Sequence, residues 1–279
     1  MRRTRSWCAL VVLASTAASM ALAENIDPDV DGSRFAYAEN AGWINARPLG
    51  SGGPGIQVDD FELTGWAWAE NLGWINLSCK NLGTCGTVAY GVANDGAGNL
   101  SGRAWSENAG WIDFAPLFGG VTIDPATGNF AGEAWSENAG WVTFAASSPV
   151  AFKVTTGWRC VPAPSPPIGA PALAVSKSAS DSLLTWSSIA GATGADVVRG
   201  RLSTLRSSAG DFSASTEACV ANDSPAGSVV DTSPVGPGDG LWFLVRGVNC
   251  GGSGSFDSGS PDQVGSRDAE VAGSGFNCP

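Results

Sequence analysis

The chain has 279 residues, a net charge of −11, 15% charged residues and no histidine. The lack of histidine excludes a Ser-His-Asp triad, a Cys-His pair and any histidine-based metal site. The acidic balance and scarce lysine argue against nucleic acid as a partner, because proteins that track phosphates need clustered lysine and arginine. Abundant glycine and serine without helical periodicity predict an all-β protein.

The first 23 residues have the pattern of a signal peptide. A basic start at Arg2, Arg3 and Arg5 precedes an apolar stretch over residues 8–20, and residues 21–23 form a small-x-small cleavage site ending at Ala23. Cleavage after Ala23 leaves about 256 residues with a net charge near −14, since three arginines are removed. No later segment reaches the roughly 18 to 20 apolar residues of a membrane span. We therefore expect a secreted protein, extracellular or at the cell surface.

An acidic segment follows in the mature chain. Asp27, Asp29 and Asp31, followed by Gly32, resemble the front half of an oxygen-ligand calcium loop. The twelfth position holds Ala38 instead of the usual glutamate, so a flexible acidic segment is the alternative. Apart from this weak calcium hypothesis, the sequence predicts no cofactor.

Residues 24–160 contain one tryptophan-rich motif four times, typified by Ala-Trp-Ser-Glu-Asn-Ala-Gly-Trp-Ile. The copies occupy residues 35–45, 67–77, 104–114 and 134–144. The last two copies also share a preceding strand and turn, so a full unit reads strand, Asp/Gly turn, strand, Glu-Asn-x-Gly turn, strand. The pattern predicts a repeat domain of stacked β-hairpins or three-stranded units, either an open stack or a closed assembly.

Glycine in each copy stands where a three-residue hairpin loop needs a positive φ. These glycines are Gly42, Gly73, Gly110 and Gly140. The third copy would then pair Glu107 with Trp111 and Trp105 with Asp113. One face would carry the tryptophans and carboxylates, and the opposite face would carry Ala104, Ser106, Ile112 and Phe114 as core. A change of register would exchange the two faces.

Two interpretations compete for the tryptophan face. The tryptophans pack against the next repeat, or they stack on sugar rings while glutamate and asparagine bond hydroxyls. The candidate ligand-binding residues are Trp68, Glu70, Trp74, Trp105, Glu107, Trp111, Trp135, Glu137 and Trp141. Catalytic residues are not expected, because a catalytic acid is normally singular whereas these glutamates occupy near-identical turns.

Six cysteines remain after the signal peptide, which predicts three disulfides in an exported chain. They are Cys79, Cys85, Cys160, Cys219, Cys250 and Cys278. Zinc is disfavoured because the chain has neither a Cys-x-x-Cys pair nor histidine. If Cys79 and Cys85 close a short loop, Cys160 must pair with one of the three later cysteines and join the two halves.

A proline-rich linker over residues 161–171 separates the repeats from a second domain over residues 172–279. Short alternating runs at 183–186, 195–199, 228–231 and 241–248 lie between turn-forming residues, which is the pattern of a β-sandwich.

Two family resemblances follow from these motifs. Residues 33–158 resemble a tryptophan-rich repeat family of exported bacterial proteins, although the first copy has Tyr37 for the first tryptophan. That resemblance implies export and no particular activity. The second half resembles a fibronectin type III-like module, with Trp186 on the second strand and residues 241–249 as the sixth. Such modules act as spacers or binding platforms.

The sequence therefore predicts a secreted, non-enzymatic binding or structural protein. Its expected partner is an extracellular polysaccharide or a surface protein, and nothing in the sequence fixes an oligomeric state. The alternatives are an accessory, substrate-binding region of an exported hydrolase and a purely structural matrix protein.

Overall fold

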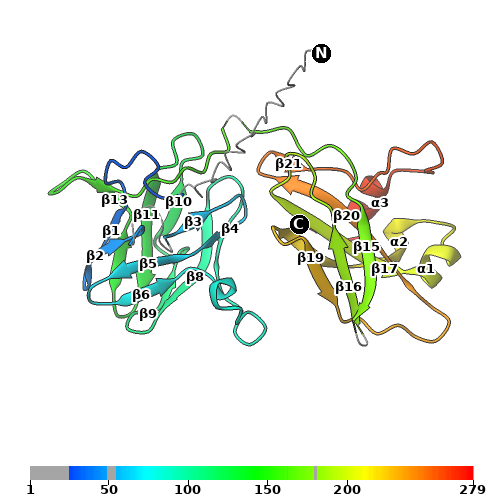
Figure 1. Cartoon of the computed structure of the whole chain (residues 1–279), viewed down its shortest axis with the longest axis horizontal. Coiled ribbons are helices and arrows are strands. Elements are labelled where there is room, and N and C mark those ends of the chain that lie inside the picture. Colours follow the sequence, from blue (N-terminus) through cyan, green and yellow to red (C-terminus); the bar gives the residue numbers. More distant parts are fainter. Residues whose placement is uncertain (1–24, 49–54, 162, 179–180, 279) are drawn as a thin grey trace, which may run out of the picture.

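The computed structural model describes residues 25–48, 55–161, 163–178 and 181–278, and the predicted signal peptide lies outside these ranges. Two β-rich bodies stand side by side, joined by the segment that crosses the top of Figure 1. The protein is all-β with a few short helices, as the composition predicts. Within the described residues, no helix is long and apolar enough to cross a membrane.

Four hairpins form the N-terminal body. Hairpin 1 is β1 (Phe35–Ala38) with β2 (Gly42–Asn45), and hairpin 2 is β5 (Trp66–Ala69) with β6 (Gly73–Asn76). Hairpin 3 is β8 (Leu100–Ser106) with β9 (Gly110–Asp113), and hairpin 4 is β11 (Phe130–Ser136) with β12 (Gly140–Thr143).

The hairpins pair side by side, and β12 returns to pair with β1 through Tyr37 opposite Thr143. The result is a closed, eight-stranded antiparallel barrel. The hairpins therefore pair edge to edge, and of the open stack and the closed assembly that the sequence left as alternatives, the closed one forms. Closure removes the exposed sheet edges that an open array would present.

The pairing register of the hairpin differs by two residues from the register that the sequence predicted. Trp105 lies opposite Trp111, not Asp113, and Ser106 lies opposite Gly110. Residues 107–109 form the turn, and Gly110 opens the next strand with φ +71°. Because side chains alternate along a strand, a register shift of two residues leaves each side chain on the face that the sequence predicted.

The predicted core face lines the barrel interior. Each first strand contributes small residues such as Ala104 and Ser106, and each second strand contributes larger ones such as Ile112 and Phe114, all at most 3% exposed. An interior cavity of only about 20 Å³ remains among these side chains. An eight-stranded barrel is just wide enough for its side chains to fill. The interior is a packed core and not a ligand chamber.

The four turns at one end of the barrel are hydrogen-bonded in a ring. Asn71 Nδ2 donates to the Ala41 carbonyl at 3.1 Å, and Asn108 Nδ2 donates to the Leu72 carbonyl at 3.3 Å. Hairpin 4 repeats the contact with Asn138, and the Asn40 backbone amide closes the ring on hairpin 4. The motif asparagine therefore joins each turn to the preceding one, a role beyond the hairpin geometry assigned from sequence.

Shorter strands extend the N-terminal body. β3 (Gln57–Val58), β4 (Glu62–Thr64), β7 (Val92–Asn94) and β10 (Gly120–Ile123) flank the long barrel strands, β13 (Ala145–Ala146) pairs with β14 (Phe152–Lys153), and a 3₁₀ turn spans Cys79–Leu82. In chain order β7, β8 and β9 form one antiparallel run, and β10, β11 and β12 form another.

The C-terminal body has two antiparallel sheets. One contains β15 (Leu173–Ser178), β16 (Asp181–Trp186) and β19 (Ser228–Asp231). The other contains β17 (Gly194–Arg201), β18 (Thr216–Ser224), β20 (Leu241–Asn249) and β21 (Gly252–Ser253). Three short helices, which the sequence did not predict, are α1 (Leu202–Ser207), α2 (Phe212–Ser215) and α3 (Arg267–Gly273).

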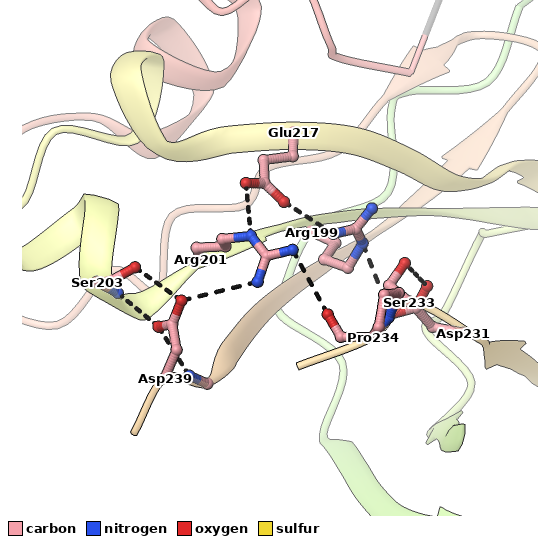
Figure 2. A network of polar contacts seen from close by, with 9 residues as sticks. Arg199, Arg201, Ser203, Glu217, Asp231, Ser233, Pro234 and Asp239 are labelled. Atoms are coloured by element: carbon pink, nitrogen blue, oxygen red, sulfur yellow. Dashed lines mark hydrogen bonds and ion pairs between the residues drawn. The ribbon is translucent and has the colours of Figure 1, made fainter. Parts of the chain in front are cut away.

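An arginine-carboxylate network joins these two sheets (Figure 2). Arg199 on β17 lies 2.9 Å from Glu217 on β18 and 3.6 Å from Asp231 on β19. Arg201 contacts the other Glu217 oxygen at 3.1 Å and Asp239 at 3.7 Å. Since β19 belongs to the three-stranded sheet and β17 to the four-stranded one, the Arg199–Asp231 ion pair links the two sheets.

The three predicted disulfides form as Cys79–Cys85, Cys160–Cys250 and Cys219–Cys278. The first closes the short loop, and the second joins the two domains, as cysteine parity predicted. Asp60 adds to this junction because its buried carboxylate accepts from Trp158 Nε1 at 2.7 Å and from the Cys250 amide at 3.0 Å. It also accepts from Thr193 Oγ1 of the C-terminal domain. A covalent bond and a buried hydrogen-bond cluster thus hold the domains together.

Candidate functional site: an aromatic band around the barrel

Eight aromatic side chains project outward from the four hairpins, and we call them the aromatic band. They are Tyr37, Trp43, Trp68, Trp74, Trp105, Trp111, Trp135 and Trp141. Each hairpin places its two aromatics directly opposite one another, where they meet edge to face with ring centroids 4.7 to 5.2 Å apart. Cross-strand aromatic pairs of this kind stabilise a hairpin.

The exposed fraction of the band's side chains shows whether they are fully buried by packing or remain accessible to a ligand. Trp43 is 46% exposed, Trp74 41% and Trp105 36%. The T-shaped ring pairs within each hairpin bury part of each ring, and neighbouring aromatics such as Phe152 beside Trp43 and Trp66 beside Trp74 bury more. More than a third of these side chains still faces outward. The band therefore combines structural packing with an accessible aromatic surface.

Grooves separate neighbouring hairpins. The first groove, about 440 Å³, lies between hairpins 1 and 2 and is lined by Trp43 from one side and by Trp68, Glu70 and Asn71 from the other. The second groove, about 420 Å³, lies between hairpins 2 and 3 and repeats this arrangement with Trp74, Trp105, Glu107 and Asn108. Each groove thus combines the second aromatic of one hairpin with the first aromatic, carboxylate and amide of the next.

The motif glutamates differ between the barrel seam and the other copies. Glu39 accepts a hydrogen bond from the Trp141 backbone amide at 3.2 Å, across the seam where hairpin 4 meets hairpin 1. Glu70, Glu107 and Glu137 are exposed and have no hydrogen-bond partner among the described residues. The carboxylates of Glu70, Glu107 and Glu137 can therefore accept hydrogen bonds from a ligand, whereas Glu39 helps to close the barrel.

The second groove contains aromatic and apolar residues that the sequence did not predict as site residues. Trp66, Leu82 and Tyr90 line it together with the motif residues. Trp66 lies two positions before Trp68 on the same outward face, so strand alternation could have identified it. Tyr90 comes from the segment before β7, which has no local signal in common with the motif. Its ring lies 5.3 Å from that of Trp111.

The structure does not bring the three aspartates of the calcium hypothesis together. Asp27 is buried, and its Oδ1 accepts from the amides of Asp31 and Gly32 at 2.9 and 3.2 Å. Asp31 instead accepts from the Ser33 amide, and hydrogen bonds from Ser33 hold the pKa of Asp31 below its usual value. Within the described ranges, no cluster of three acidic or cysteine side chains could hold a metal ion. Asp27 and Asp31 instead hold the turn over residues 27–33 through these hydrogen bonds, and Asp29 is exposed.

A further cavity of about 570 Å³, the interdomain cleft, lies between the barrel and β18 of the C-terminal domain. Its polar lining includes Glu62 and Lys80, which form an ion pair at 2.8 Å, and Asn222 and Asp223. Burial raises the pKa of Asp223 to about 6, and the nearby Asp196 carboxylate adds to this effect. Asn222 donates to Asp223 at 2.7 Å, which favours the charged form and opposes the shift.

Comparison with known proteins leaves the site to be interpreted from its own chemistry. No family model matches the chain, and none of the curated proteins matches it. The exposed indoles, the carboxylates without hydrogen-bond partners and the volumes of the grooves are therefore the basis for a function. Grooves of 420 and 440 Å³ fall within the range of about 300 to 1,000 Å³ that small-molecule sites occupy.

Proposed function

We propose that this protein is a secreted, non-enzymatic binding protein whose aromatic band contacts carbohydrate. The observation that carries the proposal is the repeated groove with indoles on both walls and a glutamate and an asparagine at its edge. Sugar rings present flat C–H faces and a rim of hydroxyl groups. The indoles offer flat apolar surfaces for the faces, and the carboxylates accept from the hydroxyls.

Repetition supports a polymeric ligand. The band encircles the barrel, so a polysaccharide or another surface polymer can engage more than one groove at the same time. Each additional contact then becomes an intramolecular event with a high effective concentration, which raises avidity even when each groove binds weakly. Weak repeated sites suit attachment to an extracellular surface.

Two further parts of the proposal concern location and the second domain. The three disulfides support an oxidising compartment, which agrees with the expected signal peptide. The three-stranded and four-stranded sheets support a fibronectin type III-like module. In this proposal the module presents the barrel and is not catalytic.

The strongest alternative is an accessory region of an exported hydrolase, in which the same grooves hold substrate for a catalytic partner. In that alternative the grooves bind carbohydrate in the same way, but they serve a hydrolase. A purely structural matrix protein is the other alternative, and the grooves with indoles on both walls favour binding over it.

The test is a screen of the mature protein on an array of uncharged glycans, followed by titration of the strongest binder. Trp68→Ala and Trp105→Ala should each weaken binding about tenfold, which corresponds to about 1.4 kcal/mol for the lost stacking surface. Phe118→Ala is the matched control, because Phe118 is 86% exposed on the same domain and lies outside the band.

The proposal is contradicted if no glycan on the array binds, or if the Phe118→Ala control loses as much affinity as the band variants. Incubation of bound glycans with the protein and analysis of their length tests the non-enzymatic part. Glycans that remain intact support a binding protein, and shortened products contradict it.

A further inference from the structure

Tyr90 joins two cavities that otherwise belong to different parts of the molecule. It lines the second groove of the aromatic band and also the interdomain cleft. Its hydroxyl accepts from Asn76 Nδ2 at 2.7 Å, and Asn76 in turn accepts from Asn81 within the Cys79–Cys85 loop. Hydrogen bonds and a disulfide-closed loop therefore hold Tyr90 where the two cavities meet.

A disulfide and hydrogen bonds join the two domains close to the cleft. The Cys160–Cys250 disulfide crosses the junction, and Asp60 contacts the C-terminal domain through Cys250 and Thr193. Asp60 lies two residues before Glu62, which lines the cleft. A ligand entering the cleft would therefore meet a preformed site and would not need to order the two domains first.

The cleft differs chemically from the groove. Its walls combine apolar surface from Phe61 and Val229 with polar groups from Asn222 and Asp223. The groove supplies stacking surface, whereas the cleft supplies hydrogen-bond donors and acceptors. A chain of sugar rings has flat faces that can stack and hydroxyl groups that can form hydrogen bonds along its whole length.

We propose that the ligand is an extended, uncharged pyranose chain that occupies the second groove, passes Tyr90 and continues into the interdomain cleft, where Asn222 and Asp223 contact it. This inference rests on the proposed carbohydrate-binding function and adds the C-terminal domain to the site. The second groove is then the principal one among the grooves of the band.

Charge selects an uncharged chain over an acidic one. Glu107 lies at the groove, and Glu62 and Asp223 lie in the cleft, with Lys80 already paired to Glu62. The whole chain also carries a net charge of −11. An acidic polysaccharide would meet like charges along this path, which costs affinity.

The experiment is titration calorimetry with two linear series, the β-1,4-linked oligomers of N-acetylglucosamine and of glucose, from disaccharide to hexasaccharide. The intact two-domain protein should bind the hexasaccharide of its preferred series at least about tenfold more tightly than the disaccharide. An Asn222→Ala, Asp223→Ala double variant should lose about fivefold to tenfold on the hexasaccharide and nothing on the disaccharide, because only the longer chain reaches the cleft. Asn277→Ala, at an exposed asparagine of the same domain that does not line the cleft, should change neither affinity.

The outcomes separate this inference from the function beneath it. Equal affinities for the two lengths, or a double variant that binds the hexasaccharide like the wild type, overturn the extended path. If Trp105→Ala still weakens binding in that case, the aromatic band remains the site. If Trp105→Ala changes no affinity, or no oligosaccharide of either series and no array glycan binds, the proposed function fails as well. Melting temperatures of all variants show whether any loss reflects unfolding.

Discussion

The two domains reach stable β structure by different means. The barrel repeats one hairpin motif four times. Alternate residues of each hairpin face inward, and hydrogen bonds join the neighbouring turns in a ring. The C-terminal domain has no such repeat. It depends on contacts between residues far apart in sequence, including the Arg199 network and the Cys219–Cys278 disulfide. Repetition therefore spreads the stability of the barrel over four equivalent hairpins, whereas the second domain depends on single long-range links.

The largest predicted effect breaks one of those links. Replacing Cys219 and Cys278 with serine opens a loop of 59 residues, which should lower the free energy of unfolding by about 4 kcal/mol. Denaturant titration with separate probes for each domain measures this loss. The C-terminal domain should unfold first while the barrel keeps its transition. Simultaneous loss of both domains would contradict their different modes of stabilisation.

A smaller effect is expected at a position that the barrel repeats as glycine, because Gly65, Gly102 and Gly132 all have a positive φ and lie against a carbonyl oxygen. Gly132 has φ +83°, and an added Cβ would lie 2.0 Å from the Gly120 carbonyl oxygen. Gly132→Ala should therefore destabilise the barrel by about 3 kcal/mol, measured as a shift in its unfolding midpoint. Gly86→Ala is the control, because a Cβ there meets nothing within 4 Å. Equal stability of the two variants would show that the strand bend at Gly132 adapts freely.

A buried serine adds a hydrogen bond to the ring of turns at the end of the barrel. Ser136 Oγ donates to the Ala109 carbonyl at 2.8 Å and is fully buried. Ser136→Ala should cost about 1 kcal/mol, because hairpins 1 and 2 carry Ala38 and Ala69 at this position and still close. Thermal unfolding measures the change. A loss of several kcal/mol would mean that the ring depends on single links as the C-terminal domain does.

The smallest effect is a pH dependence in the C-terminal domain. The pKa of Asp223, about 6, lies above its unfolded value of 3.8, so the native state binds the proton more tightly. The associated stability is present below pH 3.8 and is lost as pH rises through 6. Asp223→Asn should therefore raise the melting temperature more at pH 7.5 than at pH 4. The gain is modest because Asp223 is only partly buried and solvent screens it. Equal gains at the two pH values would contradict the assignment.

Sequence reasoning was strongest where a rule acts locally. Strand alternation correctly predicted that Ala104, Ser106, Ile112 and Phe114 face the core. Cysteine parity correctly predicted that Cys160 joins the domains. The final β-run was also predicted closely, since β20 covers Leu241–Asn249.

The remaining features depend on long-range geometry. Positive φ at Gly110 is satisfied by either the last turn residue or the first strand residue, so the sequence alone could not decide the register. Barrel closure requires β12 to find β1, about a hundred residues away. Tyr90 and Asp223 enter their cavities only through tertiary packing, so no motif could identify them.

In the proposed function, the ligand binds the outward face of the barrel, and the inward face is only core. The most direct measurement is the ¹⁵N-resolved spectrum of the tryptophan indole N–H groups during titration with the best-binding hexasaccharide. The signals of Trp68, Trp74, Trp105 and Trp111 should shift, and those of the buried Trp158 and Trp242 should stay in place. Shifts confined to Trp158 and Trp242, or an unchanged spectrum at saturating sugar, would contradict the claim.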